Sequence, residues 1–510
     1  MNYAVLIFWL LIAWSATASA QTVLVLLLAS LSFASLALIP PEITGGLSIL
    51  PQSVFAVLLI LKVLGPQMLP LSAKLVAALR LQNLGFLALF LLVSIVAALI
   101  MPRLFSEDVV IIPMRENSGA DLLRPIMANF TQSGYLTLSV LTVFAVTLTA
   151  SESGFLKTLR MAIVTGGIVC IVTGLADLVT ASVGLSALLE PFRNANYAYL
   201  TDVDVSGMKR VVGLTPEASV YGPICVDFAA AIGLLRILYP EGRERLLATV
   251  VAASLMAMAL LSTSSTAYGG LAVLVLVYVL NWIRRAFFSS PLGQREVVGE
   301  LLVGLGAMIA LLVVLLVHAS LFNPLLNLID EVILNKPLSS SFLERSHWNT
   351  IAWNTVSSTW GLGVGLGSTR TSNWFAAIIS NSGLLGAAFM GIFLVQTFAK
   401  RASLQSALIT ELLAALKLSL LPALAMAAVD CPGPDFGAWM AVIFGAISGI
   451  GALQPRRASA GRVSRGAAAP TLGSRVFGAG RVSRGAAAPT LGSRVFGRIM
   501  PRGSSPRYWP

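Results

Sequence analysis

Long runs of apolar residues dominate this chain, and short polar stretches separate them. Residues 84–100 and 301–317 carry no charged side chain over about the length that crosses the hydrocarbon core of a bilayer. Runs of this kind predict 13 membrane segments, at 3–19, 22–39, 50–66, 82–101, 133–150, 159–182, 223–239, 246–262, 268–284, 299–319, 375–397, 412–428 and 436–453. The expected fold class is an all-α, polytopic transmembrane protein.

Two interpretations are open for the first segment. Ala18, Ser19 and Ala20 resemble a signal-peptide cleavage site, but no Lys or Arg precedes them and another apolar run follows at once. We favour an uncleaved helix, and a signal peptide would leave 12 segments.

Composition excludes a soluble globular protein. Apolar residues make up 57% of the 510 residues and charged residues 11%, about half the charged share of a typical soluble chain. The three cysteines (Cys170, Cys225 and Cys431) lie in or beside apolar segments without metal-ligand spacing. We interpret them as small apolar residues.

The net charge of +12 comes almost entirely from a C-terminal tail, residues 454–510, which has 11 Arg and no acidic residue. In residues 1–453, the predicted transmembrane domain, 23 Lys and Arg nearly balance 22 acids, so no nucleic-acid partner is expected. The tail is of low complexity, and residues 460–478 recur without a mismatch at 479–497. This repeat either binds lipid or a partner, or is a duplication without a role, which we favour.

The positive-inside rule places the basic tail in the cytoplasm. Counting back from it, every short inner loop from the third segment onward contains Lys or Arg. Three long outer loops, at about 102–132, 185–222 and 320–374, then hold most of the acids. Long loops commonly carry function, so the working surface should face outward.

Candidate chemistry gathers in the second and third of these loops. They contain KRVVGLTPEAS at 209–219, SFLERSHWN at 341–349 and GLGVGLGSTR at 361–370. Ser341 and Glu344 have capping-box spacing, which predicts a helix. One stripe of that helix would carry Arg345, Asn349, Ala352, Val356 and Trp360.

Arg210, Arg345 and Arg370 together indicate an anion site on the outer face. Guanidinium groups suit phosphate because they are always charged and donate in a fixed fork. Amides of the glycine-rich run, including Gly363 and Gly365, can add an anion-binding nest. No strand precedes the run, so a dinucleotide fold is not supported. A headgroup contact or a loop salt bridge is the alternative for each arginine taken alone.

These residues resemble motifs of the bacterial O-antigen ligase and O-antigen polymerase family, which includes exopolysaccharide polymerases. The resemblance rests on Arg210-x-x-Gly213 with Glu217-Ala218-Ser219, on Arg345 and Trp348 leading into 361–368 and Arg370, and on NSGLLG at 381–386. It covers roughly residues 200–390, and elsewhere only the multi-helix topology is similar. Many relatives have Glu-Pro-Ser in place of Glu217-Ala218-Ser219.

The resemblance implies a membrane glycosyltransferase with a C-type fold in the inner (cytoplasmic) membrane of a bacterium. Its donor would be an oligosaccharide on polyprenyl (undecaprenyl) pyrophosphate, and its acceptor a hydroxyl of another glycan or of a lipid core. No metal, nucleotide sugar or other cofactor is expected. Membrane lipids and other polysaccharide assembly proteins of the cell envelope are further expected partners. Polymerase and ligase stay open as alternatives within this family.

The resemblance also suggests roles for single residues. Arg210 and Arg345 would stabilise the leaving pyrophosphate, and Arg370, Gly363, Gly365 and Trp348 would bind substrate. Glu217 and His347 are candidate general bases, since ligases of the family carry a His in the third loop. A salt bridge with Lys209 or Arg210 is the alternative for Glu217. On a regular helix His347 would point about 200° away from Arg345.

A transporter, such as a lipid-linked glycan flippase, is the alternative from another functional class, and a non-catalytic scaffold is a third. Transporters place polar residues and broken helices near the membrane midplane, often in repeated halves, and no such repeat is apparent here. Asp177 and Asp227, inside predicted segments, are either functional or in contact with water at the rim.

Overall fold

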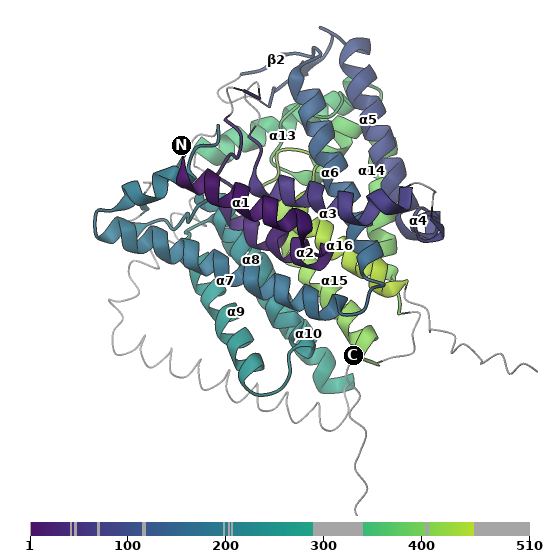
Figure 1. The fold of residues 1–510 in the computed structure, drawn as a ribbon. Helices are drawn as coiled ribbons and strands as arrows, with labels where there is room; N and C mark the ends of the chain where they lie inside the picture. The colour runs from purple at the N-terminus through teal and green to yellow at the C-terminus, as the bar shows by residue number, and fades with distance from the viewer. Residues whose placement is uncertain are drawn as a thin grey trace, which may run out of the picture. The chain divides into compact units, whose positions relative to one another are not determined.

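The computed structural model describes residues 2–40, 43–44, 48–68, 72–114, 119–196, 199–201, 204–205, 208–288, 340–402 and 407–452. The predicted segment at 299–319, the first part of the third long loop and the tail from residue 454 lie outside these ranges. Within them the chain is mostly helical (Figure 1), which confirms the all-α prediction.

Seven helices of the described part are long and apolar enough to cross a membrane. The first, Leu81–Leu104, joins a π-helical turn to α5 (Phe86–Leu104). The others are α6 (Met127–Thr149), α7 (Phe155–Ser182), α9 (Arg243–Leu261), α10 (Ser265–Phe288), α14 (Trp374–Ala399) and α15 (Ala407–Ala427). The chain is therefore a helical, multi-pass membrane protein.

Five further apolar helices are shorter: α1 (Tyr3–Thr17), α2 (Ala20–Ala29), α3 (Pro51–Met68), α8 (Ala218–Leu234) and α16 (Gly437–Gly451). Each predicted segment inside the described ranges coincides with one of these helices or one of the seven longer ones.

Helix α16 is buried along nearly its whole length and packs against α6. Gly445 and Gly449, one turn apart, make this close approach possible. A Cβ atom added at Gly445 would lie 2.7 Å from Cβ of Val146, and one at Gly449 would lie 2.4 Å from Cβ of Ala150. Small residues at this spacing let helix backbones approach in membranes, where van der Waals packing supplies much of the attraction.

The long loops contain short elements of their own. The first holds a hairpin of β1 (Val110–Ile111) and β2 (Asp121–Leu122), and the second holds a hairpin of β3 (Asp204–Val205) and β4 (Met208–Lys209). The third contributes α13 (Ser340–Ser358), so the helix predicted from Ser341 and Glu344 is confirmed and begins one residue earlier.

Helix α14 is broken at Gly383, which has φ +71° and ψ 178°. The glycine-rich run fills the break. The amide of Val364 donates to the carbonyl of Ser380 (2.8 Å), and that of Gly365 donates to the carbonyl of Asn381 (3.0 Å). The amide of Leu384 donates back to the carbonyl of Gly361 (2.8 Å), so the groups freed by the kink are satisfied.

Candidate functional site

Helix α13 turns the Arg345 side of its surface toward the protein. Arg345 and Asn349 are half-buried and Ala352 is buried, whereas His347 and Thr350 are exposed. The stripe predicted from the sequence therefore continues along the helix but stops before Trp360. That residue follows the last helical turn with φ +52° and is 83% exposed.

Asn349 fixes α13 to the loop that precedes α14. Its side-chain amide donates to Oγ of Ser372 (3.0 Å), and its Oδ1 accepts the backbone amide of Ser372 (2.9 Å). The next residues hydrogen-bond to the loop after α15: the amide of Thr371 donates to the carbonyl of Pro432, and the amide of Cys431 donates to the carbonyl of Ser372 (3.3 Å each). The hydroxyl of Thr371 donates to the carbonyl of Cys431 (3.2 Å). These contacts place Arg345 beside the loop between α15 and α16.

Arg345 forms an ion pair with Asp430 in that loop, with 3.2 Å between Nη1 and Oδ2. The same oxygen accepts the hydroxyl of Thr266, at the start of α10 (3.3 Å). Burial raises the pKa of Asp430, and the charge of Arg345 opposes that shift. A carboxylate that is part-buried, paired and raised in pKa belongs to the kind of environment found at functional sites.

Arg370 lies over the ring of Trp348, with 3.9 Å between its guanidinium carbon and the ring centroid. Its backbone amide donates to the carbonyl of Ile112 in the first long loop (2.7 Å). Burial lowers the pKa of Arg370, while the nearby charges of Glu344, Asp430 and Glu217 raise it. Trp348 thus meets Arg370 directly, through a cation–π contact.

Gly363 and Gly365 have a packing role. Their φ angles are +81° and +90°, and an added Cβ would lie 2.6 Å from the amide nitrogen of Gly383 and 2.8 Å from the carbonyl oxygen of Ala97. The amide of Gly363 donates to Oγ1 of Thr359 (3.0 Å), and the amide of Gly365 is held by the α14 break. The predicted nest is therefore not formed by these amides, which are donated inside the protein.

Arg210 lies at the end of α9, where it donates to the carbonyls of Ser262 and Thr263 (3.5 Å each). A cation is favourable at a helix C-terminus because the backbone carbonyls there carry negative charge. Burial lowers the pKa of Arg210, and the charge of Glu217 raises it. Glu217 occupies the N-cap position of α8, and its carboxylate accepts the hydroxyl of Ser219 (2.5 Å).

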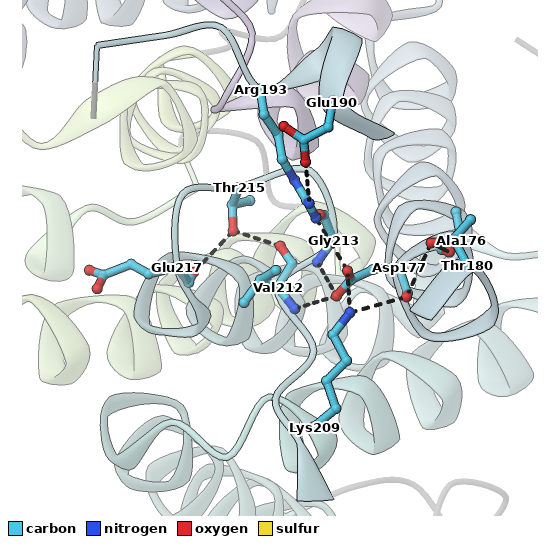
Figure 2. Close-up of polar contacts among 10 residues, drawn as sticks. All are labelled: Ala176, Asp177, Thr180, Glu190, Arg193, Lys209, Val212, Gly213, Thr215 and Glu217. Atoms are coloured by element: carbon cyan, nitrogen blue, oxygen red, sulfur yellow. Dashed lines mark hydrogen bonds and ion pairs between the residues drawn. The ribbon is translucent and has the colours of Figure 1, made fainter. Parts of the chain in front are cut away.

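A buried carboxylate, Asp177 on α7, holds the segment that carries Arg210 (Figure 2). Its Oδ1 accepts Nζ of Lys209 (2.8 Å) and Nη2 of Arg193 (3.2 Å). Its Oδ2 accepts the backbone amides of Val212 (2.9 Å) and Gly213 (3.3 Å). Asp177 is 1% exposed, so contact with water at the rim, one of the two sequence-based interpretations, is wrong.

This anchoring removes one of the two salt-bridge partners that the sequence offers for Glu217. Lys209, which the sequence offered as a salt-bridge partner, pairs with Asp177 (Figure 2). Glu217 instead acts through its charge on three groups, since it raises the pKa of Arg210, of Arg370 and of Asp430. The charge of Glu217 therefore acts on groups from three separate loops.

The structure therefore brings four predicted residues together with one that the sequence analysis missed. We call Arg210, Glu217, Arg345, Arg370 and Asp430 the arginine cluster. Each member is half-buried, so the charges are partly shielded from water yet reachable by a ligand. Three guanidinium groups and two carboxylates make up the cluster, and the exposed Glu344 also acts on Arg370 through its charge.

Asp430 could not be identified from sequence motifs, because no motif surrounds it. One signal was present: the loop between the last two predicted segments carries two acids, Asp430 and Asp435, and no cation. An uncompensated acidic loop facing arginine-rich loops indicates ion pairs between them.

His347 lies apart from the cluster. It is exposed on α13, whereas Arg345, two residues earlier, is half-buried. The helical geometry that turns Arg345 toward Asp430 turns His347 away, as 100° per residue requires. In the ranges that the structure describes, no group of three or more His, Cys, Asp or Glu side chains is placed to hold a metal ion.

No protein-family model matches this chain, and no curated protein is significantly similar to it.

Proposed function

We propose that this protein is a membrane glycosyltransferase that polymerises or ligates glycans carried on polyprenyl pyrophosphate, at the outer face of a bacterial inner membrane. The observation that carries the proposal is the arginine cluster. An ion pair joins Arg345 to Asp430 across two loops, Arg370 lies on Trp348 within the third long loop, and the charge of Glu217 acts on Arg210 and Arg370.

The chemistry of such a transfer explains the need for arginines. Breaking the bond between a sugar and pyrophosphate develops negative charge on the leaving phosphate oxygen. Positive groups fixed in advance lower the barrier because they need no rearrangement during the reaction. Burial keeps the guanidinium groups of Arg210 and Arg370 partly desolvated, which strengthens their interaction with an anion.

The acceptor hydroxyl must lose a proton to a general base. Glu217 is the candidate we favour, because its charge acts on Arg210, Arg370 and Asp430 and its carboxylate is half-buried. Asp430 already pairs with Arg345, so its part is to hold that arginine in place. His347, on the exposed face of α13, is the weaker candidate.

A transporter is supported by one feature, the break in α14 at Gly383 beside the buried side chains of Ser380, Asn381 and Ser382. Broken helices line substrate sites in many transporters. Here, however, the glycine-rich run occupies the break and accepts or donates its backbone hydrogen bonds. The kink is accounted for by packing, so the glycosyltransferase stays the better proposal.

The test is substitution of the arginines at matched protein levels in the membrane. Arg210→Ala and Arg345→Ala should each lower polymer formation roughly a hundredfold, corresponding to about 3 kcal/mol of lost transition-state stabilisation. Arg→Lys should be intermediate, since it keeps the charge but loses the fork. Arg124→Ala is a matched control, because Arg124 is another loop arginine with a carboxylate partner, Glu107 at 3.5 Å, outside the cluster.

The accumulated lipid-linked glycan separates the two functions. Loss of a polymerase or ligase leaves donor on the outer leaflet, where a glycosidase added to intact spheroplasts can digest it. Loss of a flippase leaves donor inside, where it is protected. Protected donor, or full polymer formation by both Ala variants, would contradict the proposal.

A further inference from the structure

A second group of cations lies at the other end of α14 from Arg370. Lys400 caps the C-terminus of the helix, and its stem runs over Gly451 at the end of α16. A Cβ added at Gly451 would lie 2.7 Å from Cγ of Lys400 and 3.1 Å from its Cε, so the glycine makes room for the lysine. Its Nζ donates to Oδ1 of Asn83, in the π-helical turn before α5 (2.5 Å). The packed stem and this hydrogen bond together fix the position of the Lys400 ammonium group.

Two more cations join it. Lys417 reaches from α15 and donates through Nζ to the backbone carbonyl of Lys400. Arg401, the next residue in the chain, is exposed, and its charge acts on Lys417. Two lysines, one at the end of α14 and one on α15, are thus bound by neutral acceptors, the side-chain amide of Asn83 and the carbonyl of Lys400, and Arg401 acts on Lys417 beside them.

No acid balances these charges in the described residues. Neither lysine nor Arg401 takes part in an ion pair there, whereas several cations elsewhere, such as Lys209 and Arg345, do. The negative end of the α14 dipole supplies only about half an elementary charge. Burial lowers the pKa of Lys400 to about 8, as expected for an ammonium without an anionic partner.

The two helices α14 and α15 also carry exposed apolar side chains. Val395 on α14 is 68% exposed and Leu408 on α15 is 45% exposed. A ligand that suits both the cations and these apolar side chains has a negatively charged phosphate and hydrocarbon chains. An inorganic anion would use only the cations.

We infer that Lys400, Lys417 and Arg401 bind the phosphate of an anionic phospholipid at this end of the bundle. The charge pattern of the sequence assigns this end to the cytoplasmic side, where anionic lipids attract basic residues. The positive-inside rule by itself requires only that basic residues lie on this side of the membrane, not that they form a site. The packed stem of Lys400 and the convergence of Lys417 on its carbonyl make this a specific site. The inference does not depend on the reaction proposed above.

Native mass spectrometry of the detergent-solubilised full-length protein tests it. Phosphatidylglycerol should remain bound at detergent and collision conditions that strip phosphatidylcholine. Lys417→Met should weaken phosphatidylglycerol binding about fivefold, and Lys400→Met with Lys417→Met about twentyfold or more. Lys62→Met is the matched control and should change binding less than twofold. Lys62 also donates to a backbone carbonyl, that of Ala16 (2.7 Å).

Each result of this experiment either supports or overturns the lipid site. Equal retention of the two lipids by the unsubstituted protein would overturn the site, whatever the variants do, so a variant that misfolds does not leave the question open. Equal binding by a well-folded double variant would do the same. Displacement of phosphatidylglycerol by millimolar inorganic phosphate would assign the cations to a free anion and overturn the lipid assignment. Retention in phosphate supports it.

Discussion

At the scale of single residues, Asp177 shows how one buried carboxylate can organise a loop. Desolvating a charge inside a helical bundle is expensive, and it persists only where the charge is paired and hydrogen-bonded. Asp177 has two cations and two backbone amides around it (Figure 2). It acts on the arginine cluster only through the segment it anchors, so it is a positioning residue.

Asp177→Asn should therefore lower both stability and polymer formation. It leaves Arg193 buried without its charged partner, and breaking a buried pair from one side typically costs about 3–5 kcal/mol. Glu190→Gln is the control, because Glu190 is the exposed second partner of Arg193 at 3.4 Å. Thermal unfolding in detergent, together with polymer yield at equal membrane levels, should show a clear loss for Asp177→Asn alone. Equal effects of the two variants would argue against the anchor.

The stack of Trp348 on Arg370 gives a second prediction at this scale. A cation–π contact of partly buried groups contributes about 0.5–2 kcal/mol, so Trp348→Leu should reduce polymer formation severalfold. Trp348→Phe keeps an aromatic face and should retain more activity. Trp353→Leu, a change of an exposed Trp on the same helix, should have little effect. If Phe and Leu at position 348 behave alike, the ring face is not what holds Arg370.

At the scale of elements, the glycine-rich run and the broken α14 form one unit. The run supplies the hydrogen bonds that α14 loses at Gly383, and the break supplies space for a backbone without side chains. Arg370 follows this unit directly, so its position depends on the unit's packing. The glycines affect the cluster through structure and not by contact with an anion.

Gly363→Ala should thus destabilise the protein and lower activity together. The backbone at Gly363 has φ +81°, which costs an L-residue about 1 kcal/mol or more, and the new Cβ would meet the amide of Gly383 at 2.6 Å. Gly391→Ala on α14 is the control, since nothing lies within 4 Å of a Cβ there. Thermal aggregation in detergent should shift for Gly363→Ala only. An unshifted Gly363→Ala with lost activity would restore the anion-nest interpretation.

The sequence predicts those features that depend on neighbouring residues, and it does not predict those that depend on contacts between distant segments. Transmembrane helices are encoded locally by runs of apolar residues, and α13 by its capping residues, so both could be predicted. The packing role of Gly363 could not, because it requires knowing that the run meets the break in α14. Asp430 could not be paired with Arg345 for the same reason, since no periodicity links two distant loops.

At the scale of the whole molecule, charge is sorted between the two ends of α14. Arg370, on which the charges of Glu344 and Asp430 act, lies before the start of α14, and Lys400 and Arg401 lie at its end, where neither forms an ion pair with another described residue. A bilayer maintains such a separation because Lys and Arg in short loops stay on the cytoplasmic side, whereas paired charges in long loops can cross. Orientation is therefore a property that the charges predict for the molecule as a whole.

That orientation can be measured with paired reporters, one active only in the cytoplasm and one active only after export. Fusions at Thr201 and Ser340, in the second and third long loops, should give the export signal, and a fusion at Ser459 in the basic tail should give the cytoplasmic signal. An odd number of membrane crossings must separate Ser340 from Ser459, and α14, α15 and α16 provide three. A short α16 that entered the membrane without crossing it would give the same signal at both positions. The comparison thus tests whether the buried, glycine-packed α16 is a true span.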